Sequence, residues 1–476
     1  MHFPCGIMST VPLPLTDEQK VRVVTGSTVS GLTVARELAA AFHAKGEDDA
    51  FFVMNVERVV SQWKEWRRLL PRVRPYYAVK CNGNPVLLWV LWRLGCGFDC
   101  ASKQEMDSVL RLLPALAPSA DIVYANPCKT RSYIRHARDK GVNVMTFDNA
   151  EELHKLRALF PEAELVLRIA VSDPTAVCQL NVKFGCDPVA TAPALLREAA
   201  FLRLHVVGIS FHVGSGCRDP SAFTVAIAHC RRLFLQAQEL GHNMRLLDIG
   251  GGYPGHPTPE ITFPQVAAVI NRALDEHFPL AQCVAEGVQI IAEPGRFFAS
   301  AAFSLACNVI AKTFTAAENI IASTTDAASG KGYMYYINDG VYGSFNCVLY
   351  DHYQPSGQPL FPRGSDGGVL SSVWGPTCDG LDLVLPQCHL PPLEVGEWLV
   401  FENMGAYTCA AGSEFNGFPR PAIHYAISQK TLKLMMNGDQ PYELVAADDS
   451  SDDDSISIPE SLFESSAEDT DSSASA

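Results

Sequence analysis

Tyr76-Tyr77-Ala78-Val79-Lys80-Cys81-Asn82 is a short, mostly apolar stretch in which a lysine ends the run. Aromatic and β-branched residues favour a strand here. An amine at the end of a buried strand points into a site and is partly desolvated, which lowers its pKa. Such a lysine is a nucleophile suited to Schiff-base chemistry. A surface lysine with an apolar stem is the alternative for Lys80 taken alone.

Seven more apolar runs follow, and helix-like stretches lie between them. The eight predicted strands cover residues 77–80, 97–102, 122–126, 144–148, 165–170, 208–214, 246–252 and 290–295. The helical stretches include residues 103–113, 150–160, 222–240 and 264–278. Strands that alternate with helices predict a parallel sheet, and eight such units match an α/β fold of the (β/α)8 barrel type. A doubly wound open sheet is the alternative on periodicity alone.

The rest of the chain divides by composition. Residues 51–300 are predicted to form the barrel domain, which starts with a strand at 51–54 and a helix at 56–70. Residues 301–440 are predicted to be a mostly antiparallel β-domain, because short runs are separated by Gly, Pro and Asn. Residues 1–50 are predicted to form an N-terminal extension packed partly on the β-domain. Residues 441–476, rich in Ser and Asp, are predicted to form a disordered acidic tail.

Within the β-domain, specific strands and loops are expected. The predicted strands cover residues 334–337, 347–350, 398–402 and 423–427, and the predicted loops cover residues 317–331 and 354–368. Turn-forming residues bound each of these runs.

Charge and cysteine content exclude several classes. Residues 448–476 carry ten acidic and no basic side chains, so the net charge of −15 leaves only −5 for the rest. Nucleic-acid binding needs a dense basic surface and is not expected. No run approaches the roughly 18 apolar residues of a membrane span, and no secretory signal is recognised. Fifteen cysteines without metal-ligand spacing predict reduced thiols in a cytoplasmic protein and no metal site.

Polar residues recur at the predicted strand ends, where barrel enzymes place their chemistry. Gly250-Gly251-Gly252 lets backbone N–H groups approach an anion such as a phosphate, although a tight turn is the alternative. Arg296 follows the next strand and would clamp the same phosphate. Glu293, on an apolar strand, needs a cationic partner. Together with Lys80 and a ring-stacking His212, these features indicate pyridoxal 5'-phosphate (PLP), because PLP needs a lysine and an acid at its ring nitrogen.

From residue 51 to residue 428 the chain resembles eukaryotic ornithine decarboxylase, an alanine-racemase-like PLP enzyme. The motifs that carry the resemblance are Tyr77-Ala-Val-Lys80-Cys-Asn, Gly97-Phe-Asp-Cys-Ala-Ser102, Phe211-His-Val-Gly-Ser-Gly-Cys217, Asp248-Ile-Gly-Gly-Gly252, Glu293-Pro-Gly-Arg296, Tyr350-Asp-His352, Trp374-Gly-Pro-Thr-Cys-Asp-Gly380 and Glu402-Asn-Met-Gly-Ala-Tyr407. The resemblance implies decarboxylation of L-ornithine to putrescine, the first step of polyamine biosynthesis.

The resemblance also implies residue roles. Lys80 holds PLP as a Schiff base, Glu293 pairs with the ring nitrogen, His212 stacks on the ring, and Cys378 protonates the α-carbon after CO2 leaves. The other implied cofactor-binding residues are Asp99, Arg168, Ser215, Gly250, Gly251, Gly252, Gly295, Arg296 and Tyr407. Asp351, Asp379 and Tyr350 are the implied substrate-binding residues.

Two partners are implied as well. A second copy of the chain would form a head-to-tail homodimer with shared active sites, in which Cys378 and Asp379 serve the partner's site and Lys183 pairs with Asp382 across the interface. The segment from Asn126 to Asn149 matches the antizyme-binding segment of the family. Its basic residues are Lys129, Arg131, Arg135, Arg138 and Lys140, and a solvated helix face is the alternative.

Other functions within the resemblance stay open. One is a catalytically inactive antizyme-inhibitor-like regulator, which the intact site residues disfavour. Another is a decarboxylase that prefers lysine, arginine or diaminopimelate. A third is an alanine-racemase-like enzyme, which the segment from Trp374 to Asp382 disfavours.

Overall fold

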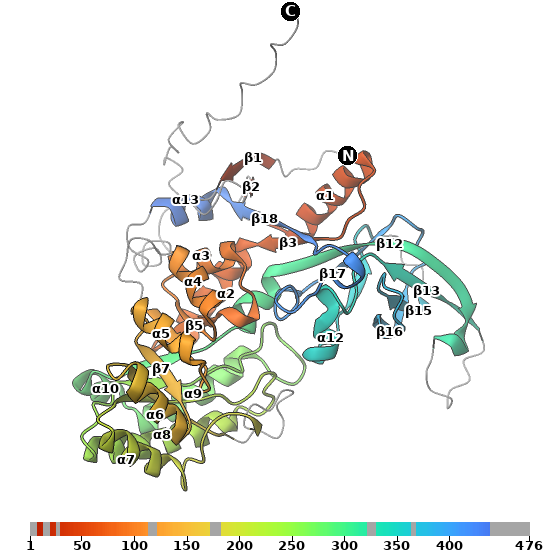
Figure 1. The fold of residues 1–476 in the computed structure, drawn as a ribbon. Helices are drawn as coiled ribbons and strands as arrows, with labels where there is room; N and C mark the ends of the chain where they lie inside the picture. The colour runs from red at the N-terminus through yellow and green to blue at the C-terminus, as the bar shows by residue number, and fades with distance from the viewer. Residues whose placement is uncertain are drawn as a thin grey trace, which may run out of the picture.

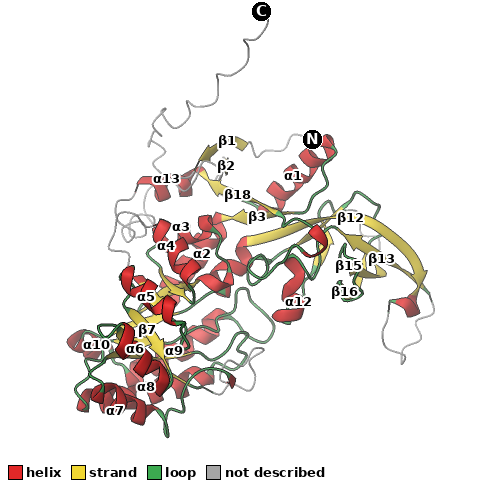
Figure 2. Cartoon of the chain, viewed as in Figure 1, coloured by secondary structure: helices red, strands yellow, loops and turns green. Residues whose placement is uncertain are grey.

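The computed structural model describes residues 7–12, 20–24, 29–112, 121–171, 182–320, 330–362 and 368–437. Figures 1 and 2 show two parts, a barrel surrounded by helices and an extended, curved sheet beside it. The predicted acidic tail, 441–476, lies outside the described residues, as does most of the predicted loop at 317–331.

The barrel contains the eight predicted strands, all parallel and closed in the order β10-β11-β4-β5-β6-β7-β8-β9. Their bounds are β4 Val73–Ala78, β5 Gly97–Cys100, β6 Ile122–Tyr124, β7 Val144–Phe147, β8 Glu164–Ile169, β9 His205–Phe211, β10 Leu246–Asp248 and β11 Gln289–Ala292. The predicted (β/α)8 barrel is therefore confirmed, and closure excludes the open doubly wound sheet.

Caps and apolar faces in the sequence explain where the barrel helices lie. Asn149 Oδ1 accepts from the Glu152 N–H at 2.9 Å at the start of α6 (Ala150–Leu159), whose Leu153 and Leu156 are buried. The others are α2 Val56–Leu69, α3 Pro85–Arg93, α4 Lys103–Leu112, α5 Arg131–Asp139, α7 Ala192–Phe201, α8 Ser221–Glu239, α9 Phe263–His277, α10 Leu280–Glu286 and α11 Arg296–Ala299. No helix in the described ranges is both long and apolar enough to cross a membrane.

The second part is one mixed sheet of ten strands. Six strand pairs are antiparallel and three are parallel, so the prediction of a mostly antiparallel domain holds. The strands are β1 Ile7–Pro12, β2 Lys20–Val24, β3 Phe51–Asn55, β12 Phe303–Ala316, β13 Lys331–Ile337, β14 Gly357–Pro359, β15 Val369–Trp374, β16 Leu383–Leu390, β17 Trp398–Phe401 and β18 Ala422–Ser428. Helices α1 (Gly31–Lys45) and α13 (Gln429–Asn437) flank it.

Three local predictions for this part are wrong. Strand β3, assigned to the barrel domain, pairs with β12 and β18 in the sheet instead. The strand predicted at 347–350 is the short helix α12 (Cys347–Tyr350), because four apolar residues carry no periodicity that separates helix from strand. Strand β14 lies inside the loop predicted at 354–368 and pairs with β17.

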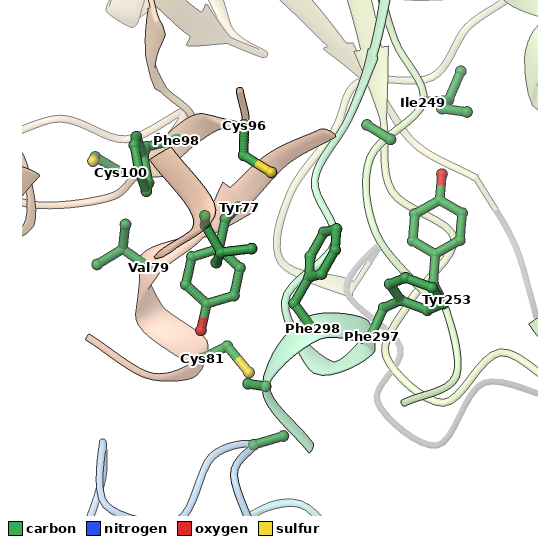
Figure 3. Packing of buried hydrophobic residues seen from close by; sticks show 14 of the residues in the cluster. Tyr77, Val79, Cys81, Cys96, Phe98, Cys100, Ile249, Tyr253, Phe297 and Phe298 are labelled. Atoms are coloured by element: carbon green, nitrogen blue, oxygen red, sulfur yellow. The ribbon is translucent and has the colours of Figure 1, made fainter. Parts of the chain in front are cut away.

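An aromatic cluster packs between the barrel strands and the surrounding helices, next to the functional residues. The barrel interior holds a separate apolar cluster, which includes Tyr76. Figure 3 shows Tyr77 and Phe98 on neighbouring strands; of the two phenylalanines of α11, Phe298 lies on the side of Tyr77 and Phe297 points toward Tyr253. The side chains of this aromatic cluster are buried. Each such burial stabilises the fold by roughly 1.5–3 kcal/mol. The aromatic cluster thus holds the turn after β4 and the helix after β11 in one place, and those two elements carry Lys80 and Arg296.

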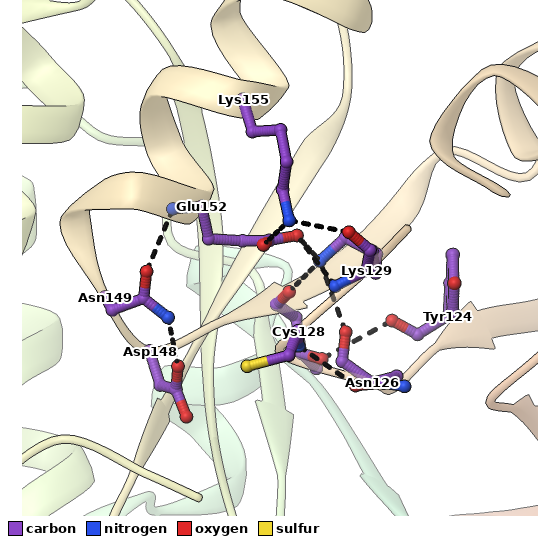
Figure 4. Close-up of polar contacts among 9 residues, drawn as sticks. Tyr124, Asn126, Cys128, Lys129, Asp148, Asn149, Glu152 and Lys155 are labelled. Carbon is purple, nitrogen blue, oxygen red and sulfur yellow. Dashed lines mark hydrogen bonds and ion pairs between the residues drawn. The ribbon is translucent and has the colours of Figure 1, made fainter. Parts of the chain in front are cut away.

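Lys129 is not part of a surface patch, which corrects the sequence prediction for the segment from Asn126 to Asn149. Its side chain is fully buried, and Nζ lies 2.8 Å from Glu152 Oε1. Nζ also donates to the Thr146 carbonyl, and Lys155 binds the other Glu152 oxygen (Figure 4). The ion pair between Lys129 and Glu152 therefore joins the loop after β6 to helix α6. A short sequence run shows the charges but not which of them the fold buries.

Removing Glu152 should destabilise the protein strongly. Glu152→Ala leaves the Lys129 ammonium buried without its carboxylate, so we expect the free energy of unfolding to fall by about 3–5 kcal/mol. The neighbouring Glu151→Ala is the matched control, since Glu151 is exposed, and its effect should stay below about 0.5 kcal/mol. Denaturant unfolding followed by circular dichroism measures both. Equal effects of the two substitutions would contradict a structural ion pair.

Candidate active site

Lys80 lies in a single 3-10 turn (Val79–Cys81) directly after β4, at the C-terminal end of the barrel. Three hydrogen bonds hold this turn. The Tyr77 hydroxyl and the Asn82 side-chain amide donate to the Asn82 and Gly405 carbonyls, each at 2.9 Å, and the Tyr407 N–H donates to the Cys81 carbonyl at 3.0 Å. Because Gly405 and Tyr407 belong to the loop after β17, barrel and sheet together position Lys80.

The Lys80 amine is paired with a buried acid. Nζ lies 2.8 Å from Asp99 Oδ2, and the Asp99 side chain is 1 % exposed. Burial lowers the pKa of Lys80, but the charges of Asp99, Glu293 and Tyr407 outweigh it and leave that pKa above the ordinary lysine value. The prediction that Lys80 has a lowered pKa is therefore wrong for the protein without cofactor. The sequence indicates the apolar strand that ends at Lys80, but it does not show that Asp99 and Glu293 on other strands lie close to the amine.

Two further acids meet beside Lys80. Asp248 ends β10, Glu293 follows β11, and both side chains are buried. Burial, together with the charges of Asp248 and Asp99, holds the pKa of Glu293 well above its usual range. Among the described residues no cation lies within ion-pair distance of Glu293. A cationic group brought to this position would therefore stabilise the Glu293 carboxylate.

His212 is a neutral imidazole against the glycine loop. Nδ1 accepts the Gly214 N–H at 2.9 Å, and burial with the charges of Arg168 and Lys80 holds the pKa of His212 well below its usual range. A Cβ on Gly251 would lie 2.6 Å from His212 Nε2 and 2.9 Å from the Glu293 carbonyl. The absence of a side chain at Gly251 therefore lets the His212 ring and the Glu293 backbone lie this close together.

Arg296 contacts three side chains near the glycine loop, those of Ser215, Asp351 and Tyr407. Its Nη2 donates to Ser215 Oγ at 3.0 Å and to Asp351 Oδ1 at 2.7 Å, and its guanidinium lies 5.2 Å from the Tyr407 ring centroid. A cavity of about 370 Å³ opens here, lined by Arg296, Ser215, Asp351 and Gly252 among others. A guanidinium, a hydroxyl and unhindered backbone are the groups that bind a phosphate.

The structure does not bring Cys378 and Asp379 to Lys80. Both follow β15, and the hydrogen bonds described for Asp379 join it to Tyr342, Thr377, Leu381 and Asp382. The Tyr342 hydroxyl lowers the pKa of Asp379. Cys378 and Tyr350 are exposed.

Asp382 is a buried anchor of this loop. It is 1 % exposed and accepts from the Val341 N–H at 2.8 Å, the Thr377 N–H at 3.0 Å and the Thr377 hydroxyl at 2.7 Å. Lys183, its predicted partner across subunits, is exposed, with Nζ 4.9 Å from the Phe184 ring centroid.

The two remaining predicted cofactor residues lie on the barrel. The Arg168 guanidinium, on β8, is 5.4 Å from the Phe184 ring centroid. A Cβ on Gly295 would lie 2.8 Å from Cys81 Cβ, so this glycine lets the Lys80 turn and α11 pack together.

Comparison with known proteins agrees with this geometry. Residues 56–300 match the family model of the pyridoxal-dependent decarboxylase, pyridoxal-binding domain. An ornithine decarboxylase of Panagrellus redivivus is 51 % identical over 410 residues, 86 % of this chain and 93 % of the relative. The chain belongs to the pyridoxal-dependent decarboxylase family.

Two other similar proteins show how far the likeness extends. Antizyme inhibitor 2 of Xenopus laevis is 48 % identical and covers 83 % of this chain and 85 % of its own. The crystal structure of the Paramecium bursaria Chlorella virus arginine decarboxylase superposes with a TM-score of 0.74 at 35 % identity, over 83 % of this chain and all of the other. The likeness therefore spans the barrel and the sheet.

The residues present fit PLP, the cofactor of this pyridoxal-dependent family. Lys80 supplies the amine that would hold the cofactor, and the cradle of Gly250, Gly251 and Gly252 leaves no room for a Cβ. Arg296 and Ser215 would hold the phosphate, and Glu293 is a buried carboxyl without a cation. PLP carries the phosphate and the basic ring nitrogen that these groups match.

Two residues beside the site were not assigned by the sequence prediction. Asp248 was noted only as the neighbour of the glycines, although an acid that ends an apolar strand is a signal of a functional position. Tyr342, which binds Asp379, gave no such signal, because an isolated tyrosine in a loop has many ordinary roles.

Gly251→Ala tests the glycine cradle. The added methyl group would push His212 and the Glu293 backbone apart at a cost of about 1–3 kcal/mol, so we expect PLP to bind about tenfold to a hundredfold more weakly. Gly31→Ala is the control, because a Cβ there meets nothing closer than 3.9 Å. Titration with PLP, followed by the visible absorbance of the bound cofactor, measures both. Unchanged affinity in Gly251→Ala would show that the cradle has room to spare.

Proposed function

We propose that this protein decarboxylates L-ornithine to putrescine and CO2 with PLP, the first step of polyamine biosynthesis. The observation that carries the proposal is one site in which Lys80, paired with buried Asp99, adjoins Glu293, His212 and the glycine cradle. The 51 % identity to an ornithine decarboxylase over most of both chains supports the choice of substrate.

The roles follow from the chemistry of the residues. When bound, PLP supplies an electron sink for the pair left on the α-carbon as CO2 departs. Asp99 holds the Lys80 amine in place at 2.8 Å. His212, being neutral, offers an imidazole face for stacking without competing as a cation, and Glu293 supplies the anion that a protonated ring nitrogen needs.

Substrate recognition is assigned to the sheet domain. Asp351 and Asp379 bind the distal ammonium of ornithine, with Tyr350 beside them, and Cys378 gives a proton to the α-carbon. Asp351 Oδ1 is also the acceptor for Arg296, so the substrate ammonium shares this carboxylate with the phosphate clamp. Cys378 and Asp379 come from a second copy of the chain in a homodimer, which their separation from Lys80 within one chain supports.

Further partners and location are part of the same proposal. Lys183 and Asp382 pair across the dimer interface. Antizyme binds the segment from Asn126 to Asn149 through Arg131, Arg135 and Lys140, which are exposed, and not through Lys129. The protein acts in the cytoplasm; the thirteen described cysteines form no disulfide, which fits a reducing compartment.

A second candidate is an antizyme-inhibitor-like regulator, favoured by the 48 % identity to such a relative. The two differ in catalysis, so kcat/KM for ornithine, lysine and arginine with added PLP tests the choice. We expect ornithine to be preferred by at least about tenfold, since one methylene is worth roughly 1–3 kcal/mol. A preference for lysine would correct the substrate, and no turnover of any of the three would support the regulator.

A further inference from the structure

Asp248 is a buried acid beside the cofactor site to which no role has been given. It is 0 % exposed and ends β10, where Leu246 and Leu247 precede it. Its Oδ1 accepts the Gly250 N–H at 2.9 Å, so it also shapes the first residue of the glycine cradle. Its Oδ2 is buried and has no N–H or O–H donor among the described residues. A buried oxygen in this state is costly unless it receives a proton from somewhere.

Among the neighbours of Asp248, one side chain can share a proton with its Oδ2 atom. Ser210 lies in register on β9, but its hydroxyl also lacks a partner and does not reach Asp248. On the opposite side, β11 pairs with β10, and the Glu293 carboxyl lies within hydrogen-bond reach of the Asp248 carboxyl. Two carboxylates cannot hydrogen-bond to each other, so the pair is satisfied only when it holds one proton.

The surrounding charges favour the same state. Asp99, on β5, is a third acid facing the pair, whereas Lys80 and Arg168 are the cations that face it. Lys80 is already paired with Asp99. The other titratable neighbours are neutral near pH 7. Burial raises the pKa of the Tyr253 phenol and of the Cys230 thiol, and it lowers the pKa of the His212 imidazole. Two full negative charges on Asp248 and Glu293 would therefore face Arg168 as their one remaining counter-charge, whereas one shared proton leaves a single negative charge that Arg168 balances.

We propose that Asp248 is a positioning residue for the cofactor: it shares one proton with Glu293, fixes the orientation of that carboxyl group, and leaves the pair with the single negative charge that a protonated ring nitrogen needs. Asp248 then holds the shared proton and donates it to Glu293, which faces the cofactor as a carboxylate. No proton is gained or lost by the pair in this arrangement. This inference rests on the proposed function only in taking PLP as the ligand.

Binding of two cofactor probes to the full-length protein tests the role. PLP is compared with its analogue in which carbon replaces the ring nitrogen, because only PLP presents the group that Glu293 recognises. We expect the wild type to bind PLP about tenfold to a hundredfold more tightly than the analogue, because this is the loss of affinity expected when one hydrogen bond to a charged group is removed. Asp248→Ala should lose most of that preference. Asp248→Asn should keep it, because the amide still donates a hydrogen bond to Glu293.

Two controls keep the result interpretable. Asp339→Asn alters a buried carboxyl of the sheet domain, 6 % exposed, and should leave the preference unchanged. If Asp248→Ala does not fold, the infrared carbonyl stretch of protonated carboxyl groups in the holoenzyme decides. The proposal expects one such band to be present in the wild type and absent from Asp248→Asn.

Three results would contradict the positioning role of Asp248. An Asp248→Ala protein that keeps the preference for PLP would overturn the role, as would equal loss in Asp248→Ala and Asp248→Asn, or a protonated-carboxyl band that persists in Asp248→Asn. The proposed function fails separately, if the wild type prefers PLP over the analogue but releases no CO2 from ornithine.

Discussion

Lys80→Ala is expected to lower kcat for CO2 release from ornithine by about a thousandfold or more, and to remove the visible absorbance of bound PLP. The reason is that the proposed function makes the Lys80 amine the nucleophile of the site, and removing a group that bonds to the reacting molecule costs far more than removing a hydrogen bond. The structure gives this amine one acid partner, Asp99, at 2.8 Å. Absorbance spectra with excess PLP and a CO2-release assay measure the two effects.

The control for Lys80→Ala is another lysine that lies outside the site. Lys140→Ala changes an exposed residue at the end of α5 and should leave both absorbance and turnover as in the wild type. If Lys80→Ala retained the absorbance band and a tenth of the activity, the covalent role of Lys80 would be wrong.

Mixing two inactive variants should restore activity. In the proposed homodimer, Lys80→Ala removes the barrel half of a site, and Cys378→Ala removes the half that the sheet of the other subunit would contribute. In a randomly mixed population half of the dimers contain one copy of each, and one of their two sites is intact. We therefore expect recovery of about one quarter of the wild-type activity. Subunits are mixed under mild dissociating conditions, and CO2 release is then measured.

The matched control mixes two barrel variants. Lys80→Ala with Glu293→Gln leaves a defect in every barrel, so no recovery is expected. Recovery in this second mixture, or none in the first when dimers are detected, would contradict active sites built from two subunits.

The repeating part of the fold could be predicted from the sequence. Eight apolar runs separated by amphipathic stretches sufficed for the barrel, because strand and helix periods differ and closure needs eight units. That Lys80, His212 and Glu293 lie near one another could be predicted for a related reason: the C-terminal ends of parallel strands meet at one face of a closed barrel.

What could not be predicted depends on contacts between distant parts of the chain. The raised pKa of Lys80 comes from Asp99 and Glu293, which lie on other strands. The burial of Lys129 depends on Glu152 in the following βα unit. The place of β3 in the sheet depends on β12 and β18, which come more than 240 residues later. None of these is encoded in local periodicity or composition.

If this protein turns ornithine into putrescine with PLP held at Lys80, both products must form together. The most direct measurement follows CO2 and putrescine from L-ornithine, with purified wild-type protein in the presence and absence of PLP. We expect equal amounts of the two products, formed only when PLP is present. A protein that binds PLP through Lys80 and yet forms neither product from ornithine would contradict the proposed function.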